Sequence, residues 1–284
     1  WYLSVVGFIR IFSPTLTNSG TFNVHAVASA SGGTEGLAFA SVDRAILQSE
    51  YSATTGSDTL DNSGTIDILA HAHAVATEYA EAEATVETVI SQNADGDGLA
   101  GSTVSTSITN SGTLNIHALA TANGGTDASA FAFLESVIQQ SADDAVNTNV
   151  TLTNSGTLDI VGQAIANAPD FALAEVTFEE PVISQSADGF GIAASTATVA
   201  LNNSGTLNIH AIASANGGTS AEAFASISSE AIRQEVFDAV TENVTLTNSG
   251  TLDIVAHAIA HAASGFATAD ATIDEPAISQ EADG

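Results

Sequence analysis

Polar and apolar residues alternate with a period of two along most of the chain, and this pattern predicts β-strands. In the segment 251–261, Leu252, Ile254 and Ala256 share one strand face, while Asp253 and His257 lie on the other. Alanine fills many alternate positions, although it is a poor strand former. Its repeated use predicts a face that packs at close distance. The segment 81–90 is the best helical candidate, but alternation favours a strand there as well.

The tetrapeptide Asn-Ser-Gly-Thr divides the chain into six repeated units. Its Asn residues are Asn18, Asn62, Asn110, Asn154, Asn203 and Asn248. Two unit types take turns. Type A continues through an Asn to a His, as at His25, and later contains Gly-Gly-Thr, whereas type B continues through an Asp, as at Asp67, and lacks Gly-Gly. The chain therefore holds three A+B pairs, with units of about 46 residues.

A second marker, Ile-x-Gln, recurs once in every unit. It begins at Ile46, Ile90, Ile138, Ile183, Ile232 and Ile278. Each unit is then predicted to contain a strand from Asn-Ser-Gly-Thr onward, a second strand that ends at Ile-x-Gln, and a short third strand such as 149–153. In type B units the loop that follows is longer and rich in Asp and Gly, which predicts a surface turn.

Units in a fixed frame without linkers predict an all-β fold, a β-solenoid (β-helix) in which each unit is one wide coil or two narrow ones. A repeated Asn at a corner supports this fold, because its amide can bond to the same amide one coil away. Three β-sandwich modules are the alternative, but they would need a linker in every pair. Residues 15–284 are predicted to form one solenoid domain, and the non-repeat segment 1–14 a cap or a subunit contact.

Charge excludes several classes of function. Three Arg, no Lys and 33 acidic residues give a formal net charge of −30. Such a chain cannot neutralise a phosphate backbone, so nucleic acid is not expected as a partner. The residues are nevertheless 44% hydrophobic, which predicts a folded core. The apolar stretch within 1–12 is too short to span a bilayer, so no membrane insertion is expected. Cysteine is absent, which excludes disulfides and thiolate metal sites.

The six units, each with Asn at a turn and a strand of small residues behind it, resemble the β-helical repeats of bacterial secreted adhesins of the filamentous-haemagglutinin and autotransporter type. The resemblance covers about residues 15–284, although the unit here is roughly twice as long as is usual there. It implies an extracellular or surface fibre of stacked coils. No functional residue carries over, since those repeats are scaffolding.

Histidines provide the first candidate site. His25, His117 and His210 occupy the same place in the three type A units, and the type B equivalents are aliphatic. With type A units on every second coil, these side chains lie about 10 Å apart, too far to share one metal. A packing role is therefore favoured. His71 and His73 share one strand face and could chelate a transition metal, but the pair is not repeated in the other units.

Acidic residues provide the second candidate. One follows each Ile-x-Gln closely, and stacked coils are expected to align them into a column: Glu50, Asp95, Asp143, Asp188, Glu235 and Asp283. Oxygen ligands at alternating positions in 93–98 suit Ca²⁺, although the Glu required by an EF-hand is missing. The predicted calcium ligands are Asp95, Asp97, Asp188 and Asp283. A merely solvated acidic turn is the alternative, and no other cofactor is expected.

No catalytic motif is found, and the units are near-copies without the local departure that an active site would need. A polysaccharide-cleaving β-helix enzyme is therefore disfavoured. The predicted function is a structural subunit or segment of an extracellular bacterial fibre, a homopolymer that assembles by head-to-tail stacking. The rival function is an adhesin module that binds sugar, such as a cell-surface or matrix polysaccharide, or calcium through its acidic repeated surface. Ice binding is a weaker rival, because the Ser/Thr run at 102–113 is less regular elsewhere.

Overall fold

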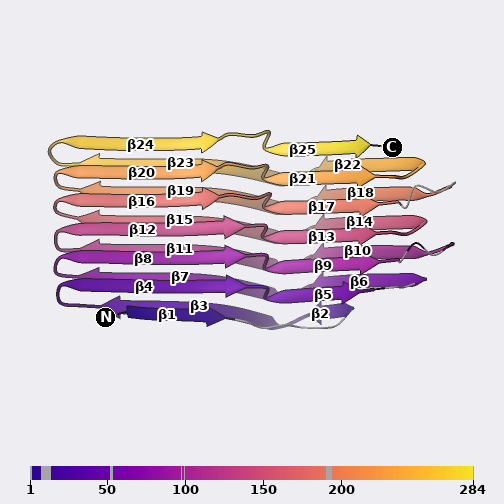
Figure 1. The fold of residues 1–284 in the computed structure, drawn as a ribbon, viewed down its shortest axis with the longest axis horizontal. Helices are drawn as coiled ribbons and strands as arrows, with labels where there is room; N and C mark the ends of the chain where they lie inside the picture. Colours follow the sequence, from indigo (N-terminus) through magenta and orange to yellow (C-terminus); the bar gives the residue numbers. More distant parts are fainter. Residues whose placement is uncertain are drawn as a thin grey trace.

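The computed structural model describes residues 2–7, 14–51, 54–96, 98, 100–189 and 194–283, and every regular element in them is a β-strand. The strands form four parallel sheets, and the chain visits each sheet once per unit (Figure 1). The fold is thus the predicted β-solenoid, and each unit is one wide coil. We call each coil a rung, numbered 1 to 6 from the N-terminal end.

Four names identify the sheets, in the order in which a rung visits them. The corner sheet contains β2 (Thr15–Asn18), β6 (Thr55–Asn62), β10 (Thr103–Asn110), β14 (Asn147–Asn154), β18 (Thr196–Asn203) and β22 (Thr241–Asn248). The long sheet contains β3 (Thr21–Ser31), β7 (Thr65–Ala76), β11 (Thr113–Gly124), β15 (Thr157–Ala168), β19 (Thr206–Gly217) and β23 (Thr251–Ala262).

The other two sheets complete the rung. The front sheet contains β1 (Tyr2–Gly7), β4 (Glu35–Asp43), β8 (Tyr79–Glu87), β12 (Asp127–Glu135), β16 (Phe171–Phe178), β20 (Ser220–Ile227) and β24 (Phe266–Ile273). The short sheet contains β5 (Ile46–Glu50), β9 (Ile90–Asp95), β13 (Ile138–Asp143), β17 (Ile183–Asp188), β21 (Ile232–Phe237) and β25 (Ile278–Asp283).

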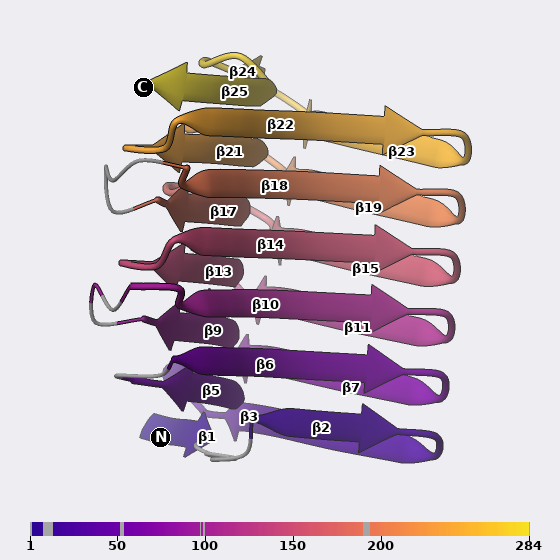
Figure 2. The same cartoon turned by 90° about the vertical axis from the view of Figure 1, so that its right-hand side faces the viewer.

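Each rung is a flattened loop with two layers. The front sheet covers the long sheet, and the short sheet covers the corner sheet (Figure 1). The rungs lie directly above one another (Figure 2). The main core lies between the long and front sheets, where alanines such as Ala72 and Ala82 are fully buried. Alternate alanines therefore face the interior, as predicted. A second, smaller core of Ala and Val lies between the short and corner sheets.

Two amide ladders run through the interior. In the predicted Asn ladder, the Nδ2 of each rung except the last donates to the Asn Oδ1 of the next rung, as from Asn62 to Asn110 at 2.8 Å. The same Nδ2 also donates to the Thr113 carbonyl at 2.8 Å. The Gln residues of Ile-x-Gln form a second ladder of opposite polarity, in which Gln140 Nε2 donates to Gln92 Oε1 of the preceding rung at 2.8 Å. Gln140 Nε2 also reaches the Thr151 carbonyl at 3.0 Å, which links the short sheet to the corner sheet.

Glycine is required at the turn that follows the Asn ladder, between the corner sheet and the long sheet. A Cβ on Gly112 would lie 2.0 Å from the Gly64 carbonyl oxygen of the rung below. The backbones therefore approach at the corner more closely than any side chain allows.

One sequence-based prediction about strands is wrong. Each rung has four strands, because Ile-x-Gln begins the short-sheet strand instead of ending the preceding one. The front-sheet strand stops before this motif, and the chain bends at residues such as Thr88, whose φ is 42°. The segment 81–90 contains no helix, as its alternation favoured: it holds most of β8 and the start of β9.

One pair of residues departs from the repeat in a compensating way. Gly162 occupies a station on the long sheet that its neighbours fill with Ala118 and Ala211. A Cβ on Gly162 would lie 2.8 Å from the ring of Phe178 and 2.6 Å from Val176 Cγ1. Phe178 in turn fills a front-sheet station that holds smaller aliphatic residues on adjacent rungs. The missing methyl group thus makes room for the larger ring.

We therefore expect Gly162→Ala to destabilise the fold by about 1–3 kcal/mol through overpacking. Phe178→Leu in the same chain should recover part of this loss, since it removes the ring, whereas Val176, which replaces the alanine of the adjacent rungs, still lies close to the new methyl group. Chemical denaturation of the two single variants and the double variant measures the coupling. Additive effects of the two substitutions would contradict the compensation.

Candidate functional site

The three type A histidines lie on the outer face of the long sheet and reach the next rung. His25 Nε2 lies 2.8 Å from Asp67 Oδ2, and His117 and His210 make the same contact at 3.2 Å with Asp159 and Asp253. Each His also stacks in register on an aliphatic residue, such as Leu69 beside His25. The alternation of imidazole and aliphatic side chains is confirmed. The pairing with Asp was not predicted, although the Asp that distinguishes type B units is the signal for it.

The same aspartates also accept from the asparagines of the next type A rung. Asn208 Nδ2 donates to Asp159 Oδ1 at 3.1 Å, and Asn115 does so to Asp67 at 3.5 Å. The hydrogen bond to His117 holds the pKa of Asp159 below its ordinary value, against the opposing effect of burial. Asn and Asp thus alternate in one column, so Asp67 and Asp159 each have neutral or donating neighbours above and below.

His71 and His73 lie side by side on β7, on the outer face. Burial lowers the pKa of His71, and the neighbouring His73 lowers it further. Among the residues that the structure describes, no group of three or more His, Asp or Glu is arranged to hold a metal ion. The His pair therefore has no third ligand of these types in the described part of the chain.

The predicted acidic column is only partly continuous. Asp95 pairs in register with Asp143, and Asp188 follows on the next rung at the same station. Phe237 then separates Asp188 from Asp283. Two predicted members do not belong to the column. Glu50 lies opposite Ala94, and Glu235 lies opposite Ser186, because these acids are offset along their strands from the other four.

The aspartates of this column influence one another. Burial raises the pKa of Asp143, and the charges of Asp188, Asp144 and Asp95 raise it further, although Ser141 donates a hydrogen bond that opposes the shift. Of the four predicted calcium ligands, Asp97 lies outside the described residues. Calcium binding therefore stays a prediction.

Asp58 is a buried carboxylate that the sequence reading missed. It points into the smaller core from β6, at a station where later rungs place Thr106, Val150 and Val199. It is fully buried, and neither carboxylate oxygen has a hydrogen-bond partner of ordinary geometry among the described residues. Burial raises its pKa from the ordinary 3.8 to about 7, the charge of Glu50 adds to the shift, and a weaker interaction with the Asn93 backbone opposes it. The repeat does contain a signal for this buried carboxylate, because Asp58 is a charged residue at a position that holds valine on later rungs.

The outer face of the front sheet carries the second feature that the sequence reading missed. Phenylalanine and acid alternate there from rung to rung in one column: Phe39, Glu83, Phe131, Glu175, Phe224 and Asp270. Phe133 lies beside this column, at a station that holds Thr85 and Thr177 on the adjacent rungs. Its ring stacks on that of Phe131, with centroids 6.2 Å apart and planes at 5°.

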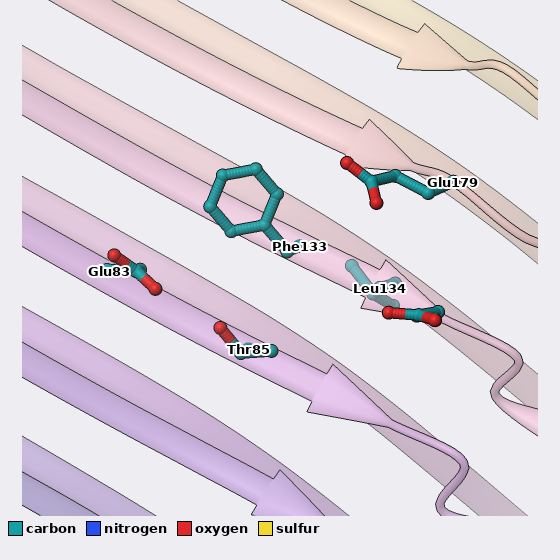
Figure 3. Close-up of a pocket in the computed structure, with 6 residues that line it drawn as sticks. Glu83, Thr85, Phe133, Leu134 and Glu179 are labelled. Carbon is teal, nitrogen blue, oxygen red and sulfur yellow. The ribbon is translucent and has the colours of Figure 1, made fainter.

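An open pocket of about 300 Å³ lies next to Phe133. Its carboxylates come from three rungs, Glu83 below, Glu135 on the same strand and Glu179 above (Figure 3). Burial raises the pKa of Glu135, and the charges of Glu87 and Glu179 raise it further. Burial likewise raises the pKa of Glu83. An aromatic face surrounded by carboxylates attracts cations, by cation–π and Coulombic interactions together.

Comparison with known proteins adds no relative: no family model, curated protein or solved structure matches this chain. In the described part of the chain, no helix is long and apolar enough to cross a membrane.

The buried carboxylate leads to a prediction about pH. An acid whose pKa is raised on folding destabilises the native state as the pH rises from the unfolded pKa through the folded one, here from about 4 to about 7. We expect Asp58→Val to stabilise the protein at pH 8 by up to about 4 kcal/mol more than at pH 4. Chemical denaturation at the two pH values measures the difference.

Asp61→Val is the matched control, because Asp61 lies on the same strand but is exposed. Its effect should be small at both pH values. An equal gain from Asp58→Val at pH 4 and pH 8 would show that folding does not raise the pKa of Asp58.

Proposed function

We propose that the chain is a structural, non-enzymatic subunit or segment of an extracellular fibre on a bacterial surface, and that copies assemble head to tail by continuing the solenoid. The support comes from the two end rungs, which present complementary edges. The contact is heterologous, so it extends without closing.

The polarity of the Asn ladder is the observation that carries this proposal. All its Nδ2 groups donate toward the C-terminal end, so Asn248 Nδ2 has no acceptor among the described residues. At the other end, Asn18 Oδ1 accepts only a long bond of 3.3 Å from the Gly20 amide, within the described part of the chain. The Gln ladder runs in the opposite sense and leaves Gln280 Oε1 at the last rung as an acceptor. A donor and an acceptor on the last rung can thus meet the first rung of another copy.

The alternation of units supports the same contact. The last rung is type B and the first is type A, so a stacked copy continues the A, B, A, B order. Asn23 of that copy would lie above Asp253, as Asn115 lies above Asp67 within the chain. Asp253 has no rung above it within the described residues, and its side chain is 53% exposed. Stacking would therefore supply the neighbour that every other aspartate of this column has.

Apolar surface at the last rung provides the driving force. Ile254, Ala256, Ala258 and Ala260 face the core but are only partly buried, because no rung lies above them in the described structure. Covering them removes apolar area from water. The net charge of −30 opposes this association, so assembly should be favoured by salt and by divalent cations.

We expect electron microscopy to show filaments much longer than one chain, since six rungs at about 4.8 Å span only about 30 Å. Ala258→Lys should abolish the filaments, because it places a charge at the stacking surface. The unstacked chain should still fold, because no rung covers this position and the lysine side chain can reach water. Ile259→Lys, on the same strand but facing outward, should not. Discrete particles of about 30 Å under all conditions would contradict the proposal.

Images with and without EDTA test whether assembly needs calcium. Filaments that form equally well with and without the chelator would exclude a calcium requirement.

A second candidate function, that of an adhesin module, is favoured by the pocket at Phe133. The aromatic ring departs from the Ser or Thr found at this station on the other rungs that the structure describes, and three carboxylates surround it. A cationic amino sugar of a surface or matrix polysaccharide would match both features.

Oligosaccharides of glucosamine and of N-acetylglucosamine test this candidate by calorimetric titration. We expect the cationic oligomer to bind and Phe133→Thr to weaken binding about tenfold, which is about 1.4 kcal/mol. Phe224→Thr, two rungs away and outside the pocket lining, is the control and should bind normally. Equal affinity for the cationic and the neutral oligomers would contradict the role of the carboxylates.

A further inference from the structure

The strand β1 lies outside the repeat but occupies a position in the front sheet where a further rung would place its own strand. It pairs in parallel with β4 and forms the N-terminal edge of the front sheet, below rung 1 (Figure 1). The corresponding edges of the other three sheets are β2, β3 and β5, all of rung 1. Within the described residues, the front sheet is therefore one strand longer at this end than its neighbours.

This extra strand conflicts with continuous stacking. When rung 6 of one copy lies directly below rung 1 of the next, β24 of the first copy must pair with β4 of the second. That edge is already taken by β1. If β1 stayed, the front sheets would join through it, but the other three sheets would be held one rung apart, about 4.8 Å too far for their hydrogen bonds. The two strands compete for one edge.

β24 matches this edge better than β1 does. β1 has six residues, whereas the other strands of the front sheet have eight or nine. In register, β1 places Leu3 opposite Ala38 and Gly7 opposite Val42. On the other six strands these two stations hold alanine and a larger apolar residue, and β24 supplies Ala269 and Ile273.

We propose that β1 is an exchangeable edge strand: it covers the front sheet of the free chain and is displaced by β24 of a second copy when the two stack. This inference rests on the proposed head-to-tail assembly and adds its regulation. The free chain is protected from unspecific edge pairing, as exposed sheet edges require. Displacement is favoured because β24 of the second copy is longer than β1 and has the sequence of the repeat. The exchange is a form of strand addition.

A disulfide that holds β1 in place tests the exchange. The chain has no cysteine, so Val6→Cys with Ser41→Cys introduces a single possible intramolecular pair. Val6 and Ser41 are register partners on adjacent strands, whose spacing suits a disulfide. We expect the oxidised variant to lose filament formation or to need at least a tenfold higher protein concentration for it. Reduction by dithiothreitol should restore assembly to the level of the unmodified chain.

The matched control places the same pair between rungs 4 and 5, away from the edge that β1 occupies. Thr177→Cys with Ser226→Cys joins β16 to β20 at the same station of the front sheet. This variant should assemble equally well in its oxidised and reduced forms. If the oxidised Val6–Ser41 variant also assembles normally, β1 is not displaced and the exchange is wrong, while head-to-tail stacking stands. If the unmodified chain and all reduced variants stay monomeric, the proposed function itself fails.

Discussion

Parallel, in-register stacking at a single rung spacing is the constraint on which the rest of the structure depends. Because each residue lies directly above its counterpart, every side chain must suit its own kind or a regular substitute about 4.8 Å away. Amides meet this condition best, since each Asn or Gln offers both a donor and an acceptor along the stack. The two ladders are buried and satisfied throughout the interior of the solenoid, as at Asn110 and Gln140. They fix the register that the apolar core alone would leave free to slip by two residues.

The same constraint explains how departures from the repeat are tolerated. Phe178 is accepted because Gly162 across the core gives up its side chain, so the volume of the layer is preserved. Asp58 has no such compensation. It lies in the smaller core with neither oxygen paired in the described structure, and it is accommodated by remaining protonated up to about pH 7. Steric and electrostatic exceptions are thus absorbed by different means, one by a partner residue and the other by a proton.

Much of this fold could be predicted from the sequence, because the spacing of the repeated motifs indicates which residues pair between rungs. The period of Asn-Ser-Gly-Thr predicted the corner and the Asn ladder, and alternating alanines predicted the closely packed core. The number of strands per rung was not predicted, since the bend at residues such as Thr88 arises from a backbone conformation without Gly or Pro. Pro181 and Pro276 mark the same bend on rungs 4 and 6, but two prolines in six units did not define a strand end. The Gln ladder was missed for another reason. Ile-x-Gln was used only to mark the repeat frame, and the hydrogen bonds that its Gln would make were not considered. The His–Asp pairs and the Phe133 pocket depend on diagonal neighbours between rungs, which become visible only when the register is known.

The register also explains why two unit types alternate in so acidic a chain. A column of identical acids would place charges about 4.8 Å apart, with a repulsion of about 0.9 kcal/mol per pair even in water. Alternation doubles the distance to about 10 Å, which halves the repulsion and reaches the screening length of dilute salt. The Asn/Asp column through Asp67 and the Phe/acid column through Glu83 both follow this rule. Asp95, Asp143 and Asp188 break it, and Asp143 has a raised pKa as a result of burial and of these neighbours. The sixth rung carries Asp253 and Asp270, and the first carries Asn23 and Phe39, so the proposed stacking of a second copy would extend the rule across the junction. The A+B pair is therefore the smallest unit that can be repeated without bringing these charges together.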